Sequence, residues 1–251
     1  MAKRSSRRAA RRLVDNSSYE ETDNVRRLFD EPQWSPIDPP DRDFKYRKNI
    51  RAQNESQQEL MTAIDAASLV FAIGAAGTGK TYVAVSKAVE ALEAGSVRRI
   101  VLSRPAVEAG ESLGFLPGDL EEKLSPYLRP LYDALCDRLS SKRLKALLAE
   151  GVIEIAPIAY MRGRTLNNAF VVIDEAQNCT YPQLKMLLTR LGWHSSIVVT
   201  GDPEQSDLLP GLSGLRDVAD KLDNLENVSV VRFSREDVVR HPLVAEMIDV
   251  L

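Results

Sequence analysis

The sequence predicts an α/β fold in which one mostly parallel sheet carries helices on both faces. From about residue 51 onward, short runs rich in Val and Ile alternate with segments whose apolar residues recur at helical spacing. The runs are apolar almost throughout, which is typical of strands buried on both faces of a parallel sheet. A glycine-rich segment joins the first run to the helical segment after it, and this indicates a strand-to-helix turn.

Six strands are expected, at residues 69–74, 98–104, 152–157, 168–174, 195–201 and 227–233. Four helices are expected between them, at 80–95, 118–139, 181–192 and 213–222, and a further helical segment precedes the first strand. We expect the helix over 118–139 to be broken at Pro126 and Pro130, because proline lacks a backbone donor and clashes with the preceding turn.

The predicted domains are an N-terminal arm over residues 1–50 and one folded domain over 51–251. A chain of 251 residues is long enough for one sizeable core and too short for two α/β domains plus an arm. The arm is expected to be poorly ordered, because a basic segment is followed by acids and prolines.

The basic segment, MAKRSSRRAARR, contains six Lys/Arg and no acid, although the whole chain has a net charge of -3. Three interpretations stay open for it: a solvated arm, an arm that binds nucleic-acid phosphates, or a transit peptide. No run approaches the roughly 18 apolar residues of a membrane span. Cys136 and Cys179 are far apart without a CxxC pair, which disfavours a disulfide framework or zinc site and favours the reducing cytoplasm.

The turn after the first strand contains the pattern GxxxxGK[ST], which is typical of a loop that binds a nucleoside triphosphate. Its backbone N–H groups would surround the phosphates, and its glycines allow the close approach. Lys80 would contact the β- and γ-phosphates, and the Thr81 hydroxyl would bind Mg²⁺. The residues assigned to the nucleotide are Gly74, Ala75, Ala76, Gly77, Thr78, Gly79, Lys80 and Thr81.

Two further buried strands end in polar residues that suit the same chemistry. Asp174 ends the strand over 168–174 and is assigned to Mg²⁺ together with Thr81, while the adjacent Glu175 is placed to polarise the attacking water. Gln205 follows the strand over 195–201 and could sense the γ-phosphate, if that strand lies between the other two. A carboxylate for the metal and another for water predict hydrolysis.

The phosphate loop, DEAQN and GDPEQ occur in the order found in the first RecA-type domain of superfamily-one helicases. The segments SRPAVEAGESLGFLPGDLEEKLSPYLRPLYDAL, YMRGRTL and DVVRHPLV are more selective, and they resemble the PhoH-like ATPases over about residues 50–251. The resemblance implies a single RecA-like P-loop NTPase domain, ATP and Mg²⁺ as ligands, ATPase activity and a role in RNA metabolism.

The resemblance also suggests roles for individual residues. Gln57 matches a helicase glutamine whose amide both donates to and accepts from the adenine edge, although an exposed helix residue is an alternative. Arg162 and Arg164 resemble a basic loop after the third strand that could contact phosphate or single-stranded nucleic acid, or they are simply solvated. Arg240 matches the arginine expected to complete the active site of a neighbouring subunit, and a surface arginine is the alternative.

We therefore predict a cytoplasmic homo-oligomeric ATPase, by resemblance a hexameric ring, coupled to single-stranded RNA or another nucleic acid. Some relatives carry a fused nuclease domain, which this chain has no residues left to form, so a nuclease is a candidate partner. A nucleotide-gated scaffold for an RNA-processing partner is an alternative function. A P-loop small-molecule kinase is another, but a kinase has no use for a water-activating glutamate such as Glu175.

Overall fold

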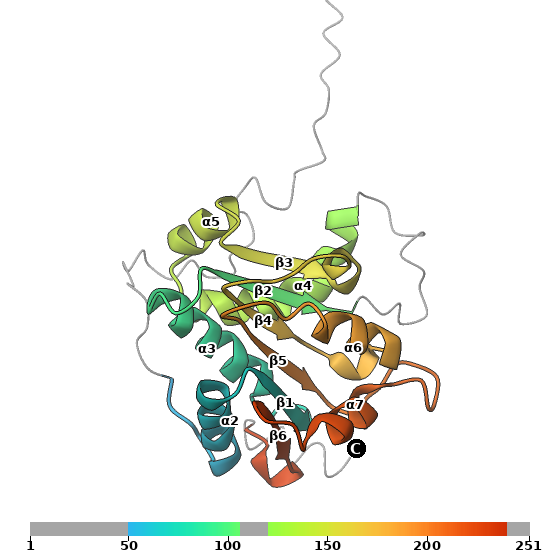
Figure 1. The fold of residues 1–251 in the computed structure, drawn as a ribbon. Coiled ribbons are helices and arrows are strands. Elements are labelled where there is room, and N and C mark those ends of the chain that lie inside the picture. Colours follow the sequence, from blue (N-terminus) through green and yellow to red (C-terminus); the bar gives the residue numbers. More distant parts are fainter. Residues whose placement is uncertain (1–49, 106–119, 240–251) are drawn as a thin grey trace, which may run out of the picture. The chain divides into compact units, whose positions relative to one another are not determined.

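The computed structural model describes residues 50–105 and 120–239, which form one α/β unit (Figure 1). Its centre is a six-stranded sheet in the order β3-β2-β4-β5-β1-β6, and every neighbouring pair is parallel. The strands are β1 (Leu69–Gly74), β2 (Arg99–Arg104), β3 (Ile153–Pro157), β4 (Ala169–Ile173), β5 (Ser196–Gly201) and β6 (Val228–Phe233). All six expected strands are confirmed. Of the predicted arm over residues 1–50, residues 1–49 lie outside the described residues.

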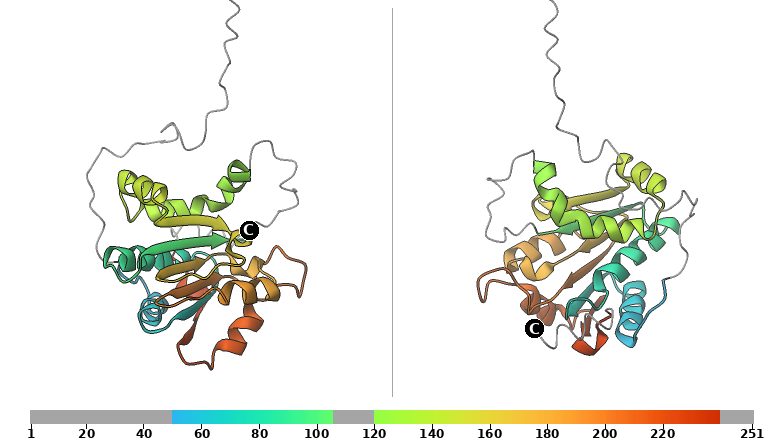
Figure 2. Two further views of the ribbon diagram at one scale, coloured as in Figure 1. Left: turned by 45° about the horizontal axis from the view of Figure 1, so that its top comes forward. Right: turned by 180° about the vertical axis from the view of Figure 1, so that it is seen from behind.

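Helices cover both faces of the sheet, as Figure 2 shows from two sides. One face carries α2 (Glu55–Ala66), α3 (Lys80–Glu93), α4 (Leu120–Cys136) and α5 (Ser141–Ala149). The other carries η1 (Ile158–Met161), η2 (Ala176–Asn178), α6 (Tyr181–Leu188) and α7 (Leu215–Leu222), and η3 (Arg235–Asp237) follows β6. No helix among the described residues is long and apolar enough to cross a membrane.

The side chains of β1 show why the strands are apolar at almost every position. Val70 and Ala72 pack in the core beneath α2, α3 and α4, while Phe71 and Ile73 pack in the core beneath α6 and α7. Successive side chains of a strand point to opposite faces, so a strand between two helical layers needs apolar residues at both parities.

The predicted break of the helix over 118–139 at Pro126 and Pro130 is wrong, since α4 runs through both prolines. A proline inside a helix costs about 3 kcal/mol. Leu128, Leu131 and Leu135 are buried by α4, and each buried leucine contributes about 1.5–3 kcal/mol. The burial of this apolar face therefore outweighs the free-energy cost of the two prolines.

Two other helices differ from the sequence prediction. Helix α5 was not predicted, although it begins at a Ser140 side chain that accepts a hydrogen bond from the N–H of Arg143. Helix α6 ends at Leu188, before the predicted end at residue 192. There the chain turns to pair with Leu166, whose N–H donates to Arg190 O (2.9 Å) and whose carbonyl accepts from Gly192 N (3.1 Å). This non-local pairing replaces the last helical turn.

Candidate active site

The phosphate loop and both polar strand ends meet at the carboxyl edge of the sheet. Strand β5 lies between β4 and β1, as the interpretation of Gln205 required. The end of β1 leads into the loop, the end of β4 leads into Asp174 and Glu175, and the end of β5 leads into Asp202. These groups line one cavity of about 460 Å³.

Three glycines give the loop its shape, with φ of +140° at Gly74, +80° at Gly77 and +83° at Gly79. A Cβ on Gly74 would lie 2.0 Å from the carbonyl oxygen of Phe233, and one on Gly79 would lie 2.7 Å from Nε2 of Gln57. Gly74 is therefore required by contact with the backbone of β6 as well as by its backbone angle, whereas at Gly79 the contact is with the end of a side chain and the backbone angle is the main requirement.

Lys80, the first residue of α3, points back over the loop. Its Nζ donates to the carbonyl oxygens of Gly74 and Ala75, both at 2.7 Å, and to Oγ1 of Thr78 at 3.2 Å. Burial lowers the pKa of Lys80, while Asp202, Glu175 and Asp174 act in the opposite direction. The ammonium thus lies among carbonyl dipoles and carboxylates, in a position from which it can reach a bound phosphate.

The carboxylate of Asp202 accepts a hydrogen bond from the backbone of the loop. Oδ2 of Asp202 accepts a hydrogen bond from the N–H of Ala76 (3.1 Å), and Oδ1 accepts one from the N–H of Glu204 (3.0 Å). Asp202 is buried. Because a phosphate would use the same kind of donor, Asp202 indicates where the loop presents its N–H groups to an anion.

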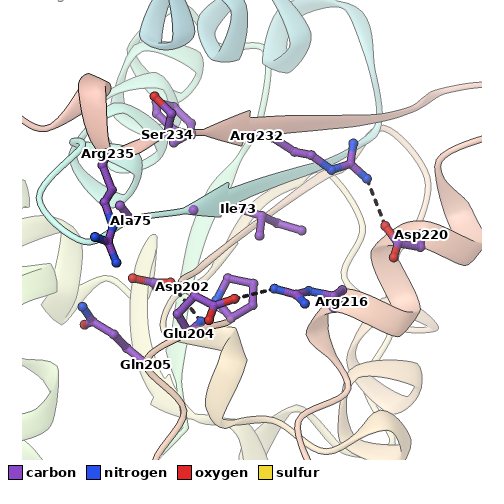
Figure 3. A pocket seen from close by; sticks show the side chains of 13 residues that line it. Ile73, Ala75, Asp202, Glu204, Gln205, Arg216, Asp220, Arg232, Ser234 and Arg235 are labelled. Atoms are coloured by element: carbon purple, nitrogen blue, oxygen red, sulfur yellow. Dashed lines mark hydrogen bonds and ion pairs between the residues drawn. The ribbon is translucent and has the colours of Figure 1, made fainter.

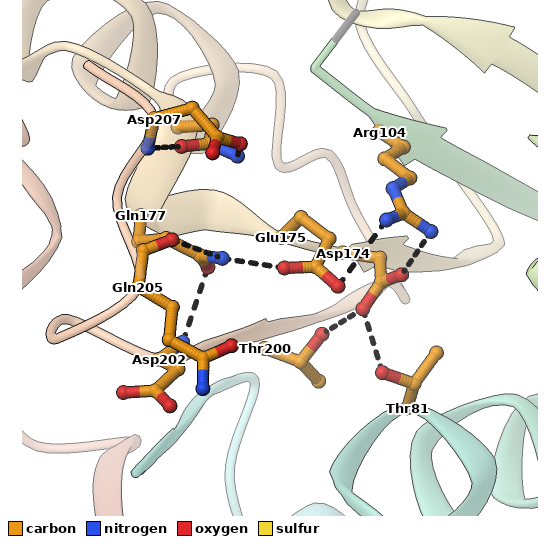
Figure 4. Close-up of polar contacts among 10 residues, drawn as sticks. Thr81, Arg104, Asp174, Glu175, Gln177, Thr200, Asp202, Gln205 and Asp207 are labelled. Atoms are coloured by element: carbon orange, nitrogen blue, oxygen red, sulfur yellow. Dashed lines mark hydrogen bonds and ion pairs between the residues drawn. The ribbon is translucent and has the colours of Figure 1, made fainter. Parts of the chain in front are cut away.

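Asp174 is held by two hydroxyl groups in an arrangement that suits a magnesium site. Oδ1 of Asp174 accepts from Thr81 Oγ1 (2.6 Å) and from Thr200 Oγ1 (2.7 Å), as Figure 4 shows. Mg²⁺ prefers oxygen ligands and is usually held by one or two carboxylates together with substrate phosphates. The described residues contain no group of three or more His, Cys, Asp or Glu side chains that could hold a metal without phosphates. Thr81 and Asp174 therefore fit Mg²⁺ that arrives with a nucleotide.

Glu175 is fixed at both of its carboxylate oxygens. Oε1 lies 3.3 Å from Nη2 of Arg104, and Oε2 accepts a hydrogen bond from the amide of Gln177 (Figure 4). The backbone at Glu175 is left-handed, with φ of +52°, which is uncommon outside glycine. An unusual backbone and two polar contacts thus direct this carboxylate into the cavity that contains Lys80 and Thr81.

Gln205 lies between two cavities. It lines the one of about 460 Å³ that is also lined by Lys80, and a second of about 540 Å³, which Figure 3 shows; Asp202 lines both as well. The N–H of Gln205 donates to Asp202 O (3.0 Å), so its backbone is tied to the end of β5. Gln205 lines the same cavity as the phosphate loop, and its sensing role stays a prediction.

Gln57 lies beneath the phosphate loop and is buried rather than exposed. Its Nε2 donates to Thr78 O (2.9 Å), and its Oε1 accepts from the N–H of Gln53 (2.9 Å). The amide is therefore engaged in supporting the loop, and contact with adenine remains a prediction. Gln57 also lines a cavity of about 270 Å³ beside the loop, together with Tyr82, Gln53 and Val239.

Four side chains of the site were missed by the sequence analysis: Arg104, Gln177, Thr200 and Asp202. All four stand at or just beyond the carboxyl end of a strand, and this position was the available signal. Arg164 forms a two-pronged ion pair with Glu154 (2.6 and 2.7 Å), which leaves the exposed Arg162 as the more accessible member of the predicted basic loop. Arg240 lies outside the described residues.

The chain is similar to known proteins both in sequence and in fold. Residues 49–251 match the family model described as PhoH-like protein. A PhoH-like protein of Bacillus subtilis is 56% identical over 203 residues, which cover 80% of this chain and 64% of the relative. One of Mycobacterium tuberculosis is 57% identical, with 80% and 58% covered. The chain thus spans about three fifths of the length of these relatives.

Among solved structures, the large terminase from a thermophilic bacteriophage has a similar fold. The TM-score is 0.50 at 15% identity, and the match covers 78% of this chain and 48% of the terminase. That likeness concerns the fold alone. The identity to the curated relatives and the match of the family model over residues 49–251 settle the family: the chain belongs to the PhoH-like proteins.

Proposed function

We propose that this protein is a Mg²⁺-dependent ATPase that hydrolyses ATP to ADP and phosphate and couples this cycle to single-stranded nucleic acid. One observation carries the proposal: a single cavity is lined by Lys80, by the hydrogen-bonded pair Thr81 and Asp174, and by Glu175. Both carboxylate oxygens of Glu175 have a polar partner. A phosphate loop alone would support nucleotide binding. The carboxylate next to the metal-binding aspartate favours hydrolysis.

Each group has a distinct role in the proposed reaction. The loop N–H groups and Lys80 bind the phosphates, and Lys80 exchanges its carbonyl partners for phosphate oxygens. Thr81 and Asp174 would hold Mg²⁺, which when bound neutralises charge on the phosphate oxygens. Glu175 accepts a proton from the attacking water, and Gln205 contacts the γ-phosphate or that water.

The proposed partner and assembly rest on the family and not on a contact seen in the structure. Single-stranded RNA is the proposed partner, with Arg162 and the basic segment of residues 1–12 as candidate contacts. We further propose a homo-oligomeric ring, a hexamer by family resemblance, in which Arg240 acts on the ATP of the next subunit. A nuclease or other RNA-processing protein is a candidate associate.

A nucleotide-gated scaffold is the second candidate, because a protein that binds ATP without rapid turnover could use the same loop. The arrangement around Glu175 favours turnover, since a scaffold gains nothing from a carboxylate held at both oxygens. A small-molecule kinase is less well supported, because a kinase transfers the phosphoryl group to an acceptor and must exclude water.

The test is steady-state ATP hydrolysis with Mg²⁺, with and without single-stranded RNA, single-stranded DNA and duplex RNA. We expect turnover that requires Mg²⁺ and rises with single-stranded RNA. Glu175→Gln is the matched control, because the side chain keeps its size and loses its proton-accepting charge. ATP binding without turnover in the wild type would favour the scaffold. Turnover unchanged by every nucleic acid would remove the proposed coupling and leave the ATPase.

A further inference from the structure

We propose that Arg104 is a positioning residue that holds the two neighbouring carboxylates, Asp174 and Glu175, and weakens the binding of a divalent cation to Asp174. This inference rests on the proposed ATPase function. Nη1 of Arg104 lies 3.6 Å from Oδ2 of Asp174, and Nη2 lies 3.3 Å from Oε1 of Glu175. One guanidinium therefore contacts both acids that the proposed reaction needs, as Figure 4 shows.

The position of Arg104 follows from the register of the sheet. Strand β2 pairs with β4 so that Ser103 is opposite Ile173, and the N–H of Asp174 donates to the carbonyl oxygen of Ser103 (2.8 Å). Arg104 is the last residue of β2, so its side chain leaves the sheet beside Asp174. Its side chain is about one fifth exposed and reaches the cavity from the side of β4 opposite β5.

The remaining oxygens of the two carboxylates have other partners. Oδ1 of Asp174 accepts from Thr81 and Thr200, and Oε2 of Glu175 accepts from Gln177. Arg104 takes the other oxygen of each acid. Without Arg104, each carboxylate would keep contacts at one oxygen only and could rotate about them. The orientation of Glu175 toward water thus depends on a residue of a different strand.

The charge and the planar shape of the guanidinium both favour arginine at this position. Two carboxylates on consecutive residues repel each other, and a cation in contact with both reduces this repulsion. The planar guanidinium can place separate nitrogens on two acceptors, whereas the lysine ammonium is a point charge on a flexible stem. A metal ion at Asp174 must share that carboxylate with Arg104. The guanidinium therefore favours catalysis by orienting Glu175 while it opposes metal binding.

The test compares Arg104→Met and Arg104→Lys with Arg99→Met. Arg99 begins the same strand at the opposite edge of the sheet, where it donates to the carbonyl oxygen of Asn167, so Arg99→Met removes the same charge away from the site. Three quantities are measured: ATP turnover with Mg²⁺, ADP affinity by calorimetry, and Mn²⁺ affinity in the presence of ADP by electron paramagnetic resonance. The last two involve no turnover.

We expect kcat of Arg104→Met to fall about 10- to 100-fold, as for a misplaced catalytic group, with ADP affinity within about threefold of the wild type. Mn²⁺ should bind at least about threefold more tightly, because a positive charge beside its ligand is gone. Arg104→Lys should lose turnover in the same range and keep wild-type Mn²⁺ affinity. Arg99→Met should match the wild type in all three.

The Mn²⁺ affinity distinguishes loss of a positioning residue from general disruption of the site, because a disrupted site would bind Mn²⁺ more weakly and not more tightly. Weaker Mn²⁺ and ADP binding by Arg104→Met would overturn the proposal, and so would turnover equal to that of Arg99→Met. If Arg104→Met does not fold, full turnover by Arg104→Lys would overturn the orienting role. If the wild type has no ATPase activity, the proposed function fails, while the Mn²⁺ measurement still decides whether Arg104 opposes metal binding.

Discussion

Lys80 and Glu175 line the same cavity, but they should affect different steps. In the proposed mechanism Lys80 contacts phosphates in both the ground and transition states, so Lys80→Ala should weaken ATP binding about 10-fold or more, as for loss of a charged hydrogen bond. The proposed role of Glu175 is on the attacking water, so Glu175→Gln should bind ATP within about threefold of the wild type and hydrolyse it at least about 100-fold more slowly. Calorimetry and a turnover assay measure the two effects.

Lys87→Ala is the control for Lys80→Ala. Lys87 is also a buried lysine of α3, but it pairs with Asp65 and Glu90 away from the phosphate loop. Its loss should leave ATP affinity unchanged. If Glu175→Gln hydrolyses ATP at the wild-type rate, Glu175 is not the catalytic base.

Gly74 offers a second test at the level of one residue. A methyl group there would overlap the backbone carbonyl of Phe233 at a φ of +140°, so Gly74→Ala should lower the free energy of unfolding by more than about 2 kcal/mol. Gly95 also has a positive φ, of +73°, but a Cβ there has no atom within 4 Å. Gly95→Ala should therefore cost only about 1–2 kcal/mol, from the backbone angle alone. Denaturant unfolding of both variants checks the difference, and equal losses would show that contact with β6 does not matter.

The sequence can predict those site residues that lie at a recognisable spacing within one segment of the chain. The predicted phosphate loop is continuous from Gly74 to Thr81, so a local pattern is enough to predict it. Arg104 and Thr200 belong to other strands, and they reach Asp174 only because β2 and β5 flank β4. That strand order depends on pairing between distant segments, which a local pattern does not contain.

Among the larger elements, strand β3 is joined to the crossover that precedes β4 by the pair between Glu154 and Arg164. The hydrogen bond from Arg164 lowers the pKa of Glu154, and burial acts in the opposite direction. A carboxyl whose pKa is lower in the folded state stabilises the protein above its unfolded pKa, about 4.3, and loses this effect as the pH falls through the folded value. Glu154→Gln should therefore destabilise the protein by about 1 kcal/mol at pH 7, since solvent screens a pair that is about one third exposed. The difference should vanish at pH values below the folded pKa.

Glu204→Gln is the matched control for this prediction. Glu204 also lies 2.6 Å from an arginine, Arg216, but both side chains are largely exposed. Its loss should have little effect on the free energy of unfolding at any pH. Urea unfolding between pH 3 and pH 7 measures both variants, and a Glu154→Gln effect that does not change with pH would exclude the ion pair as its cause.

The predictions for the elements succeeded where local pattern and tertiary burial agree. The four inner strands β1, β2, β4 and β5 are buried almost throughout between helical layers, and the edge strands β3 and β6 are partly buried, so their apolar runs were clear signals. Helix α4 differed because the burial of Leu128, Leu131 and Leu135 overrides two prolines, and propensity does not report this burial. Helix α6 ended early because residues 190–192 pair with Leu166, from a distant part of the sequence.

At the scale of the whole molecule, the question is which further cation would contact a triphosphate bound in the cavity of about 460 Å³. Among the described residues, Lys80 and Arg104 are the basic side chains that line it, and Arg104 is engaged with two carboxylates. Charge that develops on the γ-phosphate in the transition state would gain from a further arginine, which can contribute about 10³ to 10⁵ in rate. We propose, from the family resemblance, that Arg240 of a neighbouring subunit has this role, since head-to-tail contacts can close into a ring.

Action in trans can be tested with two inactive variants, Arg240→Ala and Glu175→Gln. Each alone should lack activity in a homo-oligomer. When the two are mixed and exchange subunits, some sites combine an intact Glu175 with Arg240 from the neighbouring Glu175→Gln subunit, so ATP hydrolysis should reappear. Subunit exchange is monitored by fluorescence energy transfer between labelled subunits. Activity that stays absent after confirmed exchange contradicts action in trans, and a monomeric mass by light scattering with full ATPase activity contradicts the ring.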